Sequence, residues 1–435
     1  MAFNQLFNFP KLIIGILLCV CNFRCDTPPN VNDVKPESID SYSVDNATNI
    51  EFEGTLVAFD LVNSNELIAI GKNIGTEQMT IVRTNLNGNT IWSKSLSGKE
   101  ARGHDIIKVS TGGFIVVGSL DSSFGNSNNS NLFVSRLTDS GDTIWTNTWG
   151  TKTEDEIGCC VGENIDSTFT IGCYSSKYGN ECLFVNVDGE NGEVIWTKTY
   201  DGSSIGYNPI SNIAITSSGD IVGICRSQFF NNHVSVTGLH IIKLTSGGDE
   251  LWSKTFIGEM DESGNFNCQG YDIIENNDGT FLITGTSFGI SEYANELWVL
   301  KIDATGNKIW SKTYGGPSFN DVGCWSEDIG YRIIKDPNEG FIVIGSTQRG
   351  INTGLETGSY AWIFKSDPDG NIEWENFIGS SKHDSDKGIG CFTLPNGQLL
   401  LIGVTSSNSY SQFSRSYDIY DSNTWFCFLS NGSFM

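Results

Sequence analysis

Hydrophobic and polar residues alternate along most of the chain in short runs that are separated by turn residues. The clearest example lies at residues 271–315, where YDIIEN, TFLITGTS, ELWVLKID and KIWSKTYG follow one another. The runs are rich in β-branched and aromatic residues, and Asp-Gly or Thr-Gly-Asn between them supplies the positive φ angles that tight hairpins need. The pattern predicts four consecutive β-strands, and no helical spacing competes with it.

This four-strand unit recurs along the chain, and a tryptophan marks the last strand of each copy. The marker stands in phrases such as IWSKSLSG, IWTNTWG, IWTKTYDG and LWSKTFIG. The marker tryptophans are Trp92, Trp145, Trp196, Trp252, Trp310 and Trp374. Their spacing drifts around a period of roughly 55 residues, which is typical of repeats whose cores match and whose loops differ in length.

Counting the strands of the repeat predicts the number of units. First strands occur seven times, near Leu56, Asp105, Cys160, Ile213, Asp272, Arg332 and Cys391. Third strands also occur seven times, but fourth strands follow only six of them. The chain is therefore predicted to form an all-β, seven-bladed β-propeller of four-stranded blades.

The missing fourth strand has a natural supplier at the other end of the chain. NIEFEG, at residues 49–54, precedes the first blade, and TWFCFLS is the last third strand. Because an unpaired edge strand is a liability, we expect NIEFEG to pair with TWFCFLS and close the ring. Six blades with an irregular extension is the model to consider if this closure fails.

The marker tryptophans have two possible roles, blade packing and ligand stacking. We expect packing, because burying each ring against the adjacent blade would fix the spacing between blades. A glycine ends most second strands and predicts close backbone approach. These glycines are Gly71, Gly118, Gly172, Gly285, Gly345 and Gly403. The fourth copy has Cys225 at this position, which predicts a slight distortion of that blade.

Several turns of the repeat resemble a known family. In DATGNKIW, at residues 303–310, the sequence resembles the Asp-x-x-Gly turn followed by Trp of the pyrroloquinoline-quinone-like propeller repeats, and SDPDGNIEW keeps the same spacing. The unit ends are also similar to the Trp-x-Lys-x-Tyr-Gly-Gly repeats of bacterial surface and outer-membrane lipoproteins. The resemblance runs from about residue 50 to the end and implies a propeller blade without implying a reaction.

The amino terminus differs from the rest of the chain. Lys11 is followed by LIIGILLCVC, an apolar run that suits a signal peptide at residues 1–25 and is too short to span a bilayer. Its Leu18-Cys19-Val20-Cys21 resembles the lipobox of bacterial lipoproteins, which implies lipidation of Cys21, although Val20 stands where that family has a small residue. Removal as an ordinary signal peptide is the alternative.

Residues beyond the apolar run divide into a tether and a domain. Residues 26–48 are polar and contain prolines, as expected of a solvated tether, and residues 49–435 are predicted to form a single propeller domain. We therefore expect an exported protein that is lipid-anchored at the outer membrane or cell surface, or secreted.

Composition and charge exclude some classes of partner. The chain has 435 residues, 49 glycines and a formal net charge of -25 at pH 7. Nucleic-acid binding is excluded because it needs clustered basic residues that neutralise phosphates. Direct adsorption to anionic lipid is disfavoured for the same reason, so we expect membrane contact only through a lipid anchor, and a monomer.

The search for linear chemistry yields no assignment. Cys159-Cys160 resembles the adjacent cysteine pair of the quinone enzymes, but Cys160 falls where other copies have Ile, as a small buried hydrophobe would. The histidines are scattered over different repeats, at positions 104, 233, 240 and 383, and the turn DPDGNIE only faintly resembles a calcium loop. We assign no catalytic residue, no metal ligand and no cofactor.

One cysteine pair stands apart from those that replace apolar strand residues. Cys173 closes the second strand of the third unit, and Cys182 opens its third strand. We expect the two to face each other across the hairpin and to form a disulfide in an oxidising compartment.

These observations predict a noncatalytic binding or scaffold protein of the cell envelope or surface. Its partner would be a protein or glycan that contacts the connections of variable length between second and third strands. The alternative is a propeller enzyme, either a quinoprotein or a polysaccharide-active hydrolase or lyase with carboxylates at the centre of the ring.

Overall fold

A computed structural model describes most of the chain from Tyr42 onward, and these residues belong to one compact unit, Asp40–Met435. The described residues are 42–43, 47–97, 101–121, 129–151, 153–176, 181–201, 209–231, 234–258, 266–288, 295–315, 327–337, 340–348, 359–379, 385–406, 422–430 and 432–434. Within these ranges, no helix is long and apolar enough to cross a membrane. The proposed lipidation residue Cys21 lies outside them.

Within each blade, consecutive strands pair antiparallel, so chain order is also spatial order. Blade 1 contains β3 (Gly54–Asn63), β4 (Glu66–Asn73), β5 (Met79–Asn85) and β6 (Thr90–Ser95). Blade 2 contains β7 (Ala101–Lys108), β8 (Phe114–Asp121), β9 (Ser130–Leu137) and β10 (Thr143–Trp149). Blade 3 contains β11 (Glu156–Glu163), β12 (Phe169–Ser175), β13 (Glu181–Val187) and β14 (Val194–Asp201).

The later blades repeat this plan. Blade 4 contains β15 (Ile210–Ile215), β16 (Ile221–Asn231), β17 (Val234–Leu244) and β18 (Glu250–Ile257). Blade 5 contains β19 (Phe266–Glu275), β20 (Phe281–Phe288), β21 (Asn295–Ile302) and β22 (Lys308–Tyr314). Blade 6 contains β23 (Ile329–Lys335), β24 (Phe341–Thr347), β25 (Tyr360–Ser366) and β26 (Ile372–Gly379). Blade 7 contains β27 (Ser385–Thr393), β28 (Leu399–Ser406) and β29 (Ser422–Ser430).

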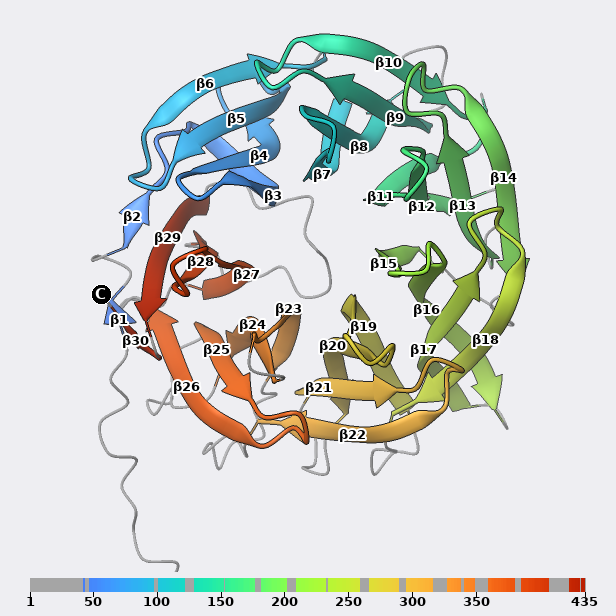
Figure 1. Ribbon diagram of the computed structural model, residues 1–435, viewed down its shortest axis with the longest axis vertical. Helices are drawn as coiled ribbons and strands as arrows, with labels where there is room; N and C mark the ends of the chain where they lie inside the picture. The colour runs from blue at the N-terminus through green and yellow to red at the C-terminus, as the bar shows by residue number, and fades with distance from the viewer. Residues whose placement is uncertain are drawn as a thin grey trace, which may run out of the picture. The chain divides into compact units, whose positions relative to one another are not determined.

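The seven blades of this unit are arranged in a ring, as Figure 1 shows, with the first strand of each blade nearest the centre and the fourth on the rim. A short parallel pairing of β17 with β19 joins blades 4 and 5 into one sheet. The prediction of an all-β, seven-bladed propeller is therefore confirmed. Radial closure suits this sequence because each blade has apolar residues on both faces and can bury them only between two neighbours.

Both chain ends complete blade 7. The short strand β2 (Thr48–Asn49) pairs antiparallel with Trp425 and Phe426 of β29, and the Ile50 N–H donates to the Thr424 carbonyl at 3.1 Å. The other part of the β29 edge pairs with β30 (Ser433–Phe434). Closure by an N-terminal strand is confirmed, and the carboxyl terminus contributes to it as well.

The closing segment is shorter than the predicted 49–54. Hydrogen bonds from the Phe52 N–H to the Ile50 carbonyl and from the Gly54 N–H to the Phe52 carbonyl turn the chain away from β29 and into β3. The paired segments also begin earlier than residue 49, because β1 (Tyr42–Ser43) pairs in parallel with Ile378 and Gly379 of β26.

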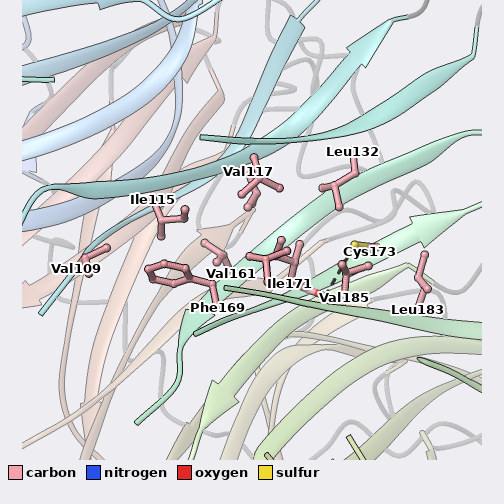
Figure 2. Packing of buried hydrophobic residues seen from close by; sticks show 12 residues of the cluster. Val109, Ile115, Val117, Leu132, Val161, Phe169, Ile171, Cys173, Leu183 and Val185 are labelled. Atoms are coloured by element: carbon pink, nitrogen blue, oxygen red, sulfur yellow. Dashed lines mark hydrogen bonds between the residues drawn. The ribbon is translucent and has the colours of Figure 1, made fainter. Parts of the chain in front are cut away.

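Apolar side chains fill the spaces between neighbouring blades. Figure 2 shows the cluster between blades 2 and 3, where Val117 and Leu132 of one blade face Ile171 and Val185 of the next. All four side chains are at most 3% exposed. A phenylalanine that opens the second strand of several blades, such as Phe169 here, is also buried in this layer. The core is therefore a series of interfaces between blades.

The first strand of each of the seven blades contains a bulge, and in several blades a glycine of the second strand makes a close backbone contact beside it. In blade 5, Gly270 pairs with Gly285 and the register shifts before Asp272. A Cβ at Gly285 would collide with the Gln269 carbonyl oxygen, so this position requires glycine. In blade 3 the equivalent partner of Gly158 is Cys173. The placement of Gly172 at this repeat position was therefore wrong by one residue.

Candidate functional site

The marker tryptophans lie on the rim and contact the turn between the third and fourth strands of the next blade. A Cβ at Gly141, a blade 2 turn residue with φ of 77°, would lie 2.6 Å from the Trp92 ring of blade 1. Further tryptophans lie 2.5–3.2 Å from where a Cβ would stand on the corresponding glycine of the following blade; these pairs are Trp145 with Gly192, Trp196 with Gly248, Trp252 with Gly306, Trp310 with Gly370 and Trp374 with Gly432. The turn glycine leaves the space that each ring fills.

The lysine and tyrosine that follow the tryptophan contact the same turn. Lys312 Nζ donates to Asn371 Oδ1 at 3.0 Å, and the Tyr314 hydroxyl donates to the Gly370 carbonyl at 2.9 Å. Alternate residues of a strand share a face, so Trp, Lys and Tyr at positions i, i+2 and i+4 all point to the next blade. This geometry explains the Trp-x-Lys-x-Tyr phrase as a contact between blades.

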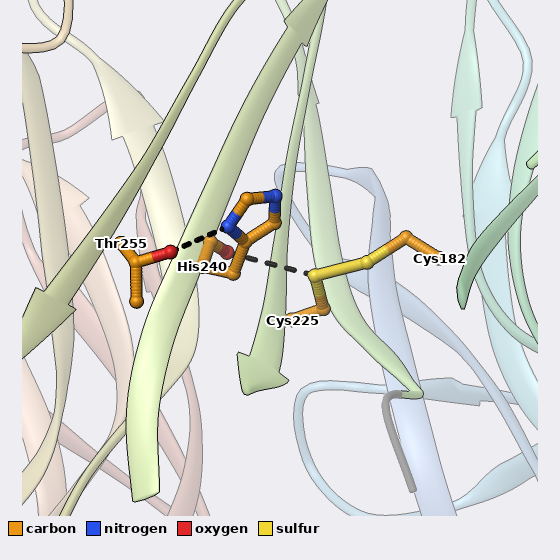
Figure 3. The surroundings of a disulfide bond; sticks show 4 residues. All are labelled: Cys182, Cys225, His240 and Thr255. Atoms are coloured by element: carbon orange, nitrogen blue, oxygen red, sulfur yellow. Dashed lines mark hydrogen bonds between the residues drawn. A yellow bond between two sulfur atoms is a disulfide. The ribbon is translucent and has the colours of Figure 1, made fainter. Parts of the chain in front are cut away.

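Cys182 forms a disulfide with Cys225 of blade 4, as Figure 3 shows, so the predicted pair of Cys173 and Cys182 was wrong. Cys173 pairs with Leu183 across the hairpin, which places Cys182 one position further and on the opposite face of the sheet. Cys173 accordingly lies in the cluster between blades 2 and 3, and Cys182 lies in the cluster between blades 3 and 4. The disulfide joins neighbouring blades.

The remaining motifs do not form a reactive centre in the described parts of the chain. Cys160 is fully buried in the apolar cluster between blades 3 and 4. The turn that resembles a calcium loop uses its first carboxylate locally, because Asp367 Oδ1 accepts the N–H groups of Asp369 and Asn371. Among the described residues, no group of three His, Cys, Asp or Glu side chains could hold a metal ion. His233 and His383 lie outside these residues.

Carboxylates of the innermost strands bind exposed backbone N–H groups near the centre of the ring. Asp105 accepts the Ile106 N–H on one oxygen and the N–H of Val161, in blade 3, on the other, both at 3.0 Å. Asp60 links blade 1 to the Lys108 N–H of blade 2 at 2.6 Å. These side chains satisfy edge donors that have no further strand to pair with.

Asp272 of blade 5 makes the most extensive of these links. It accepts the Ile273 N–H at 3.0 Å and the Ile333 N–H of blade 6 at 2.9 Å, and Asn212 of blade 4 donates to it through Nδ2. Arg332 of blade 6 forms an ion pair with it at 3.6 Å. Three adjacent blades therefore meet at one carboxylate that is only 6% exposed.

Arg332 interacts electrostatically with carboxylates of three different blades. The negative charges of Asp272, Asp105 and Asp60 raise the pKa of Arg332. Burial raises the pKa of Asp60, while hydrogen bonds from the Lys108 and Leu61 N–H groups oppose this change. The Arg332 side chain is nevertheless 36% exposed, so solvent reaches the centre of the ring.

Two tyrosines occupy the bulges one residue before Asp272 and Arg332. The rings of Tyr271 and Tyr331 are 5.7 Å apart and inclined at 55°. His104 holds the same position in blade 2, where its Nδ1 lies 2.9 Å from the Gly158 carbonyl oxygen. Burial lowers the pKa of His104 to about 4, so the ring is neutral at pH 7 and donates to this carbonyl.

Sequence reasoning missed this central group, although the repeat contained its signal. HDII, YDII and YRII place Asp105, Asp272 and Arg332 at one position of the aligned first strands. A charged residue at a position that is otherwise apolar or small indicates a polar environment. The contact of Cys225 with Cys182 could not be found this way, because it depends on the distance between two blades.

The comparisons with known proteins concern the fold alone. No protein family model matches the sequence, and no curated protein is significantly similar to it. Hydrazine synthase of Kuenenia stuttgartiensis is structurally similar with a TM-score of 0.50 and 10% identity, over 81% of this chain and 93% of the other.

Two other structures show lower similarity. The quinohemoprotein alcohol dehydrogenase of Comamonas testosteroni aligns over 82% of this chain and 66% of the dehydrogenase chain, with a TM-score of 0.47 and 10% identity. The propeller domain of the trilobed protease of Pyrococcus furiosus covers 86% and 94%, with a TM-score of 0.42 and 12% identity. Membership in the pyrroloquinoline-quinone-like repeat family stays a prediction.

Proposed function

We propose that the protein is a noncatalytic propeller that binds a protein or glycan partner at the cell envelope or surface. The observation that carries this proposal is the contrast between the two ends of the blades. Connections between third and fourth strands are short, as from Leu137 to Thr143 or from Ile302 to Lys308. Connections between second and third strands range from Asn231 to Val234 in blade 4 up to Ser406 to Ser422 in blade 7.

Strand direction places the variable connections on one side. Because the strands of a blade alternate in direction, the connections from second to third strands and from fourth to first strands leave the same end of each blade. The opposite end carries the turns that the rim tryptophans cover. Variable connections on a rigid ring are the usual location of binding residues.

The central carboxylates favour a binding protein over an enzyme. Both oxygens of Asp105 and of Asp60 accept backbone N–H groups. Such bonds stabilise the ionised form and hold each oxygen in place, which suits a structural link better than proton transfer. A titration with quinone and calcium tests the quinoprotein alternative, for which we expect no change in absorbance.

The proposed location follows from the amino-terminal sequence. We propose that the protein is exported and is either anchored through lipid on Cys21 or released after cleavage. Mass spectrometry of the mature amino terminus distinguishes the two. A lipidated Cys21 supports the anchor, whereas an unmodified start at or beyond Asp26 rules it out.

Exchange of connections tests the binding proposal. The connections 348–359 and 407–421 are replaced by the shorter connection 74–78 of blade 1, and capture of envelope proteins and glycans is compared with that of the parent chain. We expect loss of capture with an unchanged melting temperature. In the control, the turn 138–142 is replaced by 303–307 at the opposite end, and capture is expected to persist. Equal capture by all three proteins would contradict the proposal.

A further inference from the structure

In the described parts of the chain, Arg332 has hydrogen-bond donors without a protein acceptor. Its guanidinium carries five N–H groups, and among these residues it forms one ion pair, to Asp272 at 3.6 Å. The side chain is 36% exposed on an innermost strand. An arginine held by one carboxylate, with the rest of its donors reaching solvent, is positioned to donate to oxygen atoms of a ligand.

The surrounding charge selects the type of ligand. Asp272, Asp105 and Asp60 lie near Arg332, and the chain as a whole carries a formal charge of -25. A phosphate or carboxylate ligand would be repelled by this field before reaching the arginine. A neutral ligand with hydroxyl groups can accept hydrogen bonds from Arg332 without this repulsion.

The two bulge tyrosines add an aromatic surface beside these polar groups. Tyr271 and Tyr331 are partly exposed, and their rings contact each other at 5.7 Å across blades 5 and 6. Each lies directly before a member of the ion pair, Asp272 or Arg332. The Tyr271 hydroxyl donates to Gln269 Oε1 at 3.1 Å, so the pair offers a sugar ring chiefly the apolar faces of its aromatic rings.

We propose that the centre of the ring at blades 5 and 6 binds a neutral sugar unit of an oligosaccharide. Arg332 donates to sugar oxygens, and Tyr271 with Tyr331 contacts the ring face. This rests on the proposed binding function and selects a glycan as the partner. The bulge that displaces Tyr331 from the strand register is part of the site, since it places the tyrosine beside Arg332.

Calorimetric titration of the full chain with neutral hexasaccharides tests this site. The probes are maltohexaose, cellohexaose, xylohexaose and chitohexaose, and hexagalacturonate is the anionic comparison. We expect at least one neutral probe to bind and the anionic probe to bind at least tenfold more weakly. Hydrogen exchange of the bound protein should slow at the amides of residues 331–333.

Two variants and one control connect binding to these residues. Arg332→Lys keeps the charge and removes the planar fork, and Tyr331→Leu removes the ring; each should weaken binding by roughly tenfold, the usual effect of losing about 1.4 kcal/mol. Lys254→Gln, on an exposed position of the rim strand β18, should leave binding unchanged. Melting temperatures report whether each variant folds. If a variant does not fold, the slowing of hydrogen exchange at residues 331–333 of the parent chain decides whether the sugar binds there.

The possible outcomes separate this site from the general binding proposal. Absence of binding by every neutral probe, tighter binding of hexagalacturonate, or unchanged affinity in both variants would overturn the sugar site. If capture from the envelope still depends on the exchanged connections in that case, the binding function stands and only the central site is wrong. If neutral probes bind but replacing the connections has no effect on capture, the sugar site is supported and the role of the variable connections in binding is wrong.

Discussion

The junction between blades 5 and 6 and the junction that closes the ring between blades 7 and 1 are formed by different kinds of contact. At the first, Trp310, Lys312 and Tyr314 of β22 contact the blade 6 turn through their side chains. At the second, the backbone of Asn49 lies over the turn glycine Gly88. The repeat therefore supplies the internal junctions, and the chain end replaces it where the repeat is missing (Figure 1).

The closing junction depends on a few local bonds of one segment. The Glu51 N–H donates to the Gly88 carbonyl at 2.9 Å, and the Thr90 hydroxyl donates to the Glu51 carbonyl. Ile50 is buried in the apolar cluster that blades 7 and 1 share. β2 and its flanking residues make these contacts, so a deletion confined to this segment weakens the closing junction and leaves the sequence of the strands from β3 to β30 unchanged.

Deletion of residues 47–53 should have the largest effect of the changes considered. It removes β2, exposes the edge of β29 and opens the shared cluster. A loss of several kcal/mol is a large share of a typical stability of about 5–15 kcal/mol, so we expect aggregation or a fall in melting temperature of many degrees. Deletion of residues 26–41 is the control, and equal melting temperatures for the two deletions would contradict the role of β2.

Removal of the inter-blade disulfide should have the next largest effect. Cys182 and Cys225 are separated by 43 residues, and closing a loop of this size stabilises a fold by about 4 kcal/mol in the chain-entropy model. We expect the variant carrying Cys182→Ala and Cys225→Ala to melt at a lower temperature. Reductant should lower the melting temperature of the parent chain to that of the variant. A reductant effect that persists in the variant would show that another thiol pair is responsible.

His104 at the junction of blades 2 and 3 should make stability depend on pH. Its folded pKa of about 4 is below the usual histidine value of 6.5, so protonation favours the unfolded chain. The contribution of neutral His104 to the free energy of unfolding is present above about pH 6.5. It is lost as the pH falls toward 4, and the loss is up to about 3 kcal/mol. Denaturant melts at several pH values measure it, with His104→Gln as the control. The same pH dependence in both proteins between pH 6.5 and 4 would contradict this assignment.

Trp310→Ala probes an internal junction directly. The ring stacks near Phe341 at a centroid distance of 6.1 Å and covers Gly370, so its loss should cost about 2–3 kcal/mol, less than for a fully buried tryptophan. Ile309 is 50% exposed, and Ile309→Ala should have almost no effect. Denaturant unfolding of the two variants provides the comparison, and equal losses would show that the tryptophan does not support the junction.

Tyr314→Phe should have the smallest effect. It keeps the ring against Phe364 at 4.8 Å and removes the hydrogen bond to the Gly370 carbonyl. The expected loss is about 1 kcal/mol, measured by denaturant unfolding. Tyr314→Leu should cost more because it also removes the ring. If Tyr314→Phe is as stable as the parent chain, the hydroxyl makes no net contribution.

The regular parts of the fold were predictable because they are repeated. Alternation of apolar and polar residues predicts each strand, and glycine turns between the runs predict the hairpins. The missing fourth strand also predicted closure by the amino terminus. These features are encoded within a few residues of one another, so local patterns are sufficient to identify them.

The parts that were wrong or missed depend on distances between blades. Cys173 and Cys182 are close in the sequence but lie on opposite faces of a sheet, and only the packing of blade 3 on blade 4 brings Cys225 to Cys182. Repeat alignment could have shown that Arg332 and Asp272 occupy the same position of neighbouring blades. It could not have shown that the charges of Asp105 and Asp60 also act on Arg332.

The sequence by itself determined the strand order, the number of blades and the residues that repeat at each junction, since these follow from periodicity and turn chemistry. The tertiary structure alone decided which cysteines pair, how far the closing strand extends and which charges meet at the centre of the ring. The physical reason is that ring closure brings first strands from distant blades within reach of one another, and such contacts have no fixed separation along the chain.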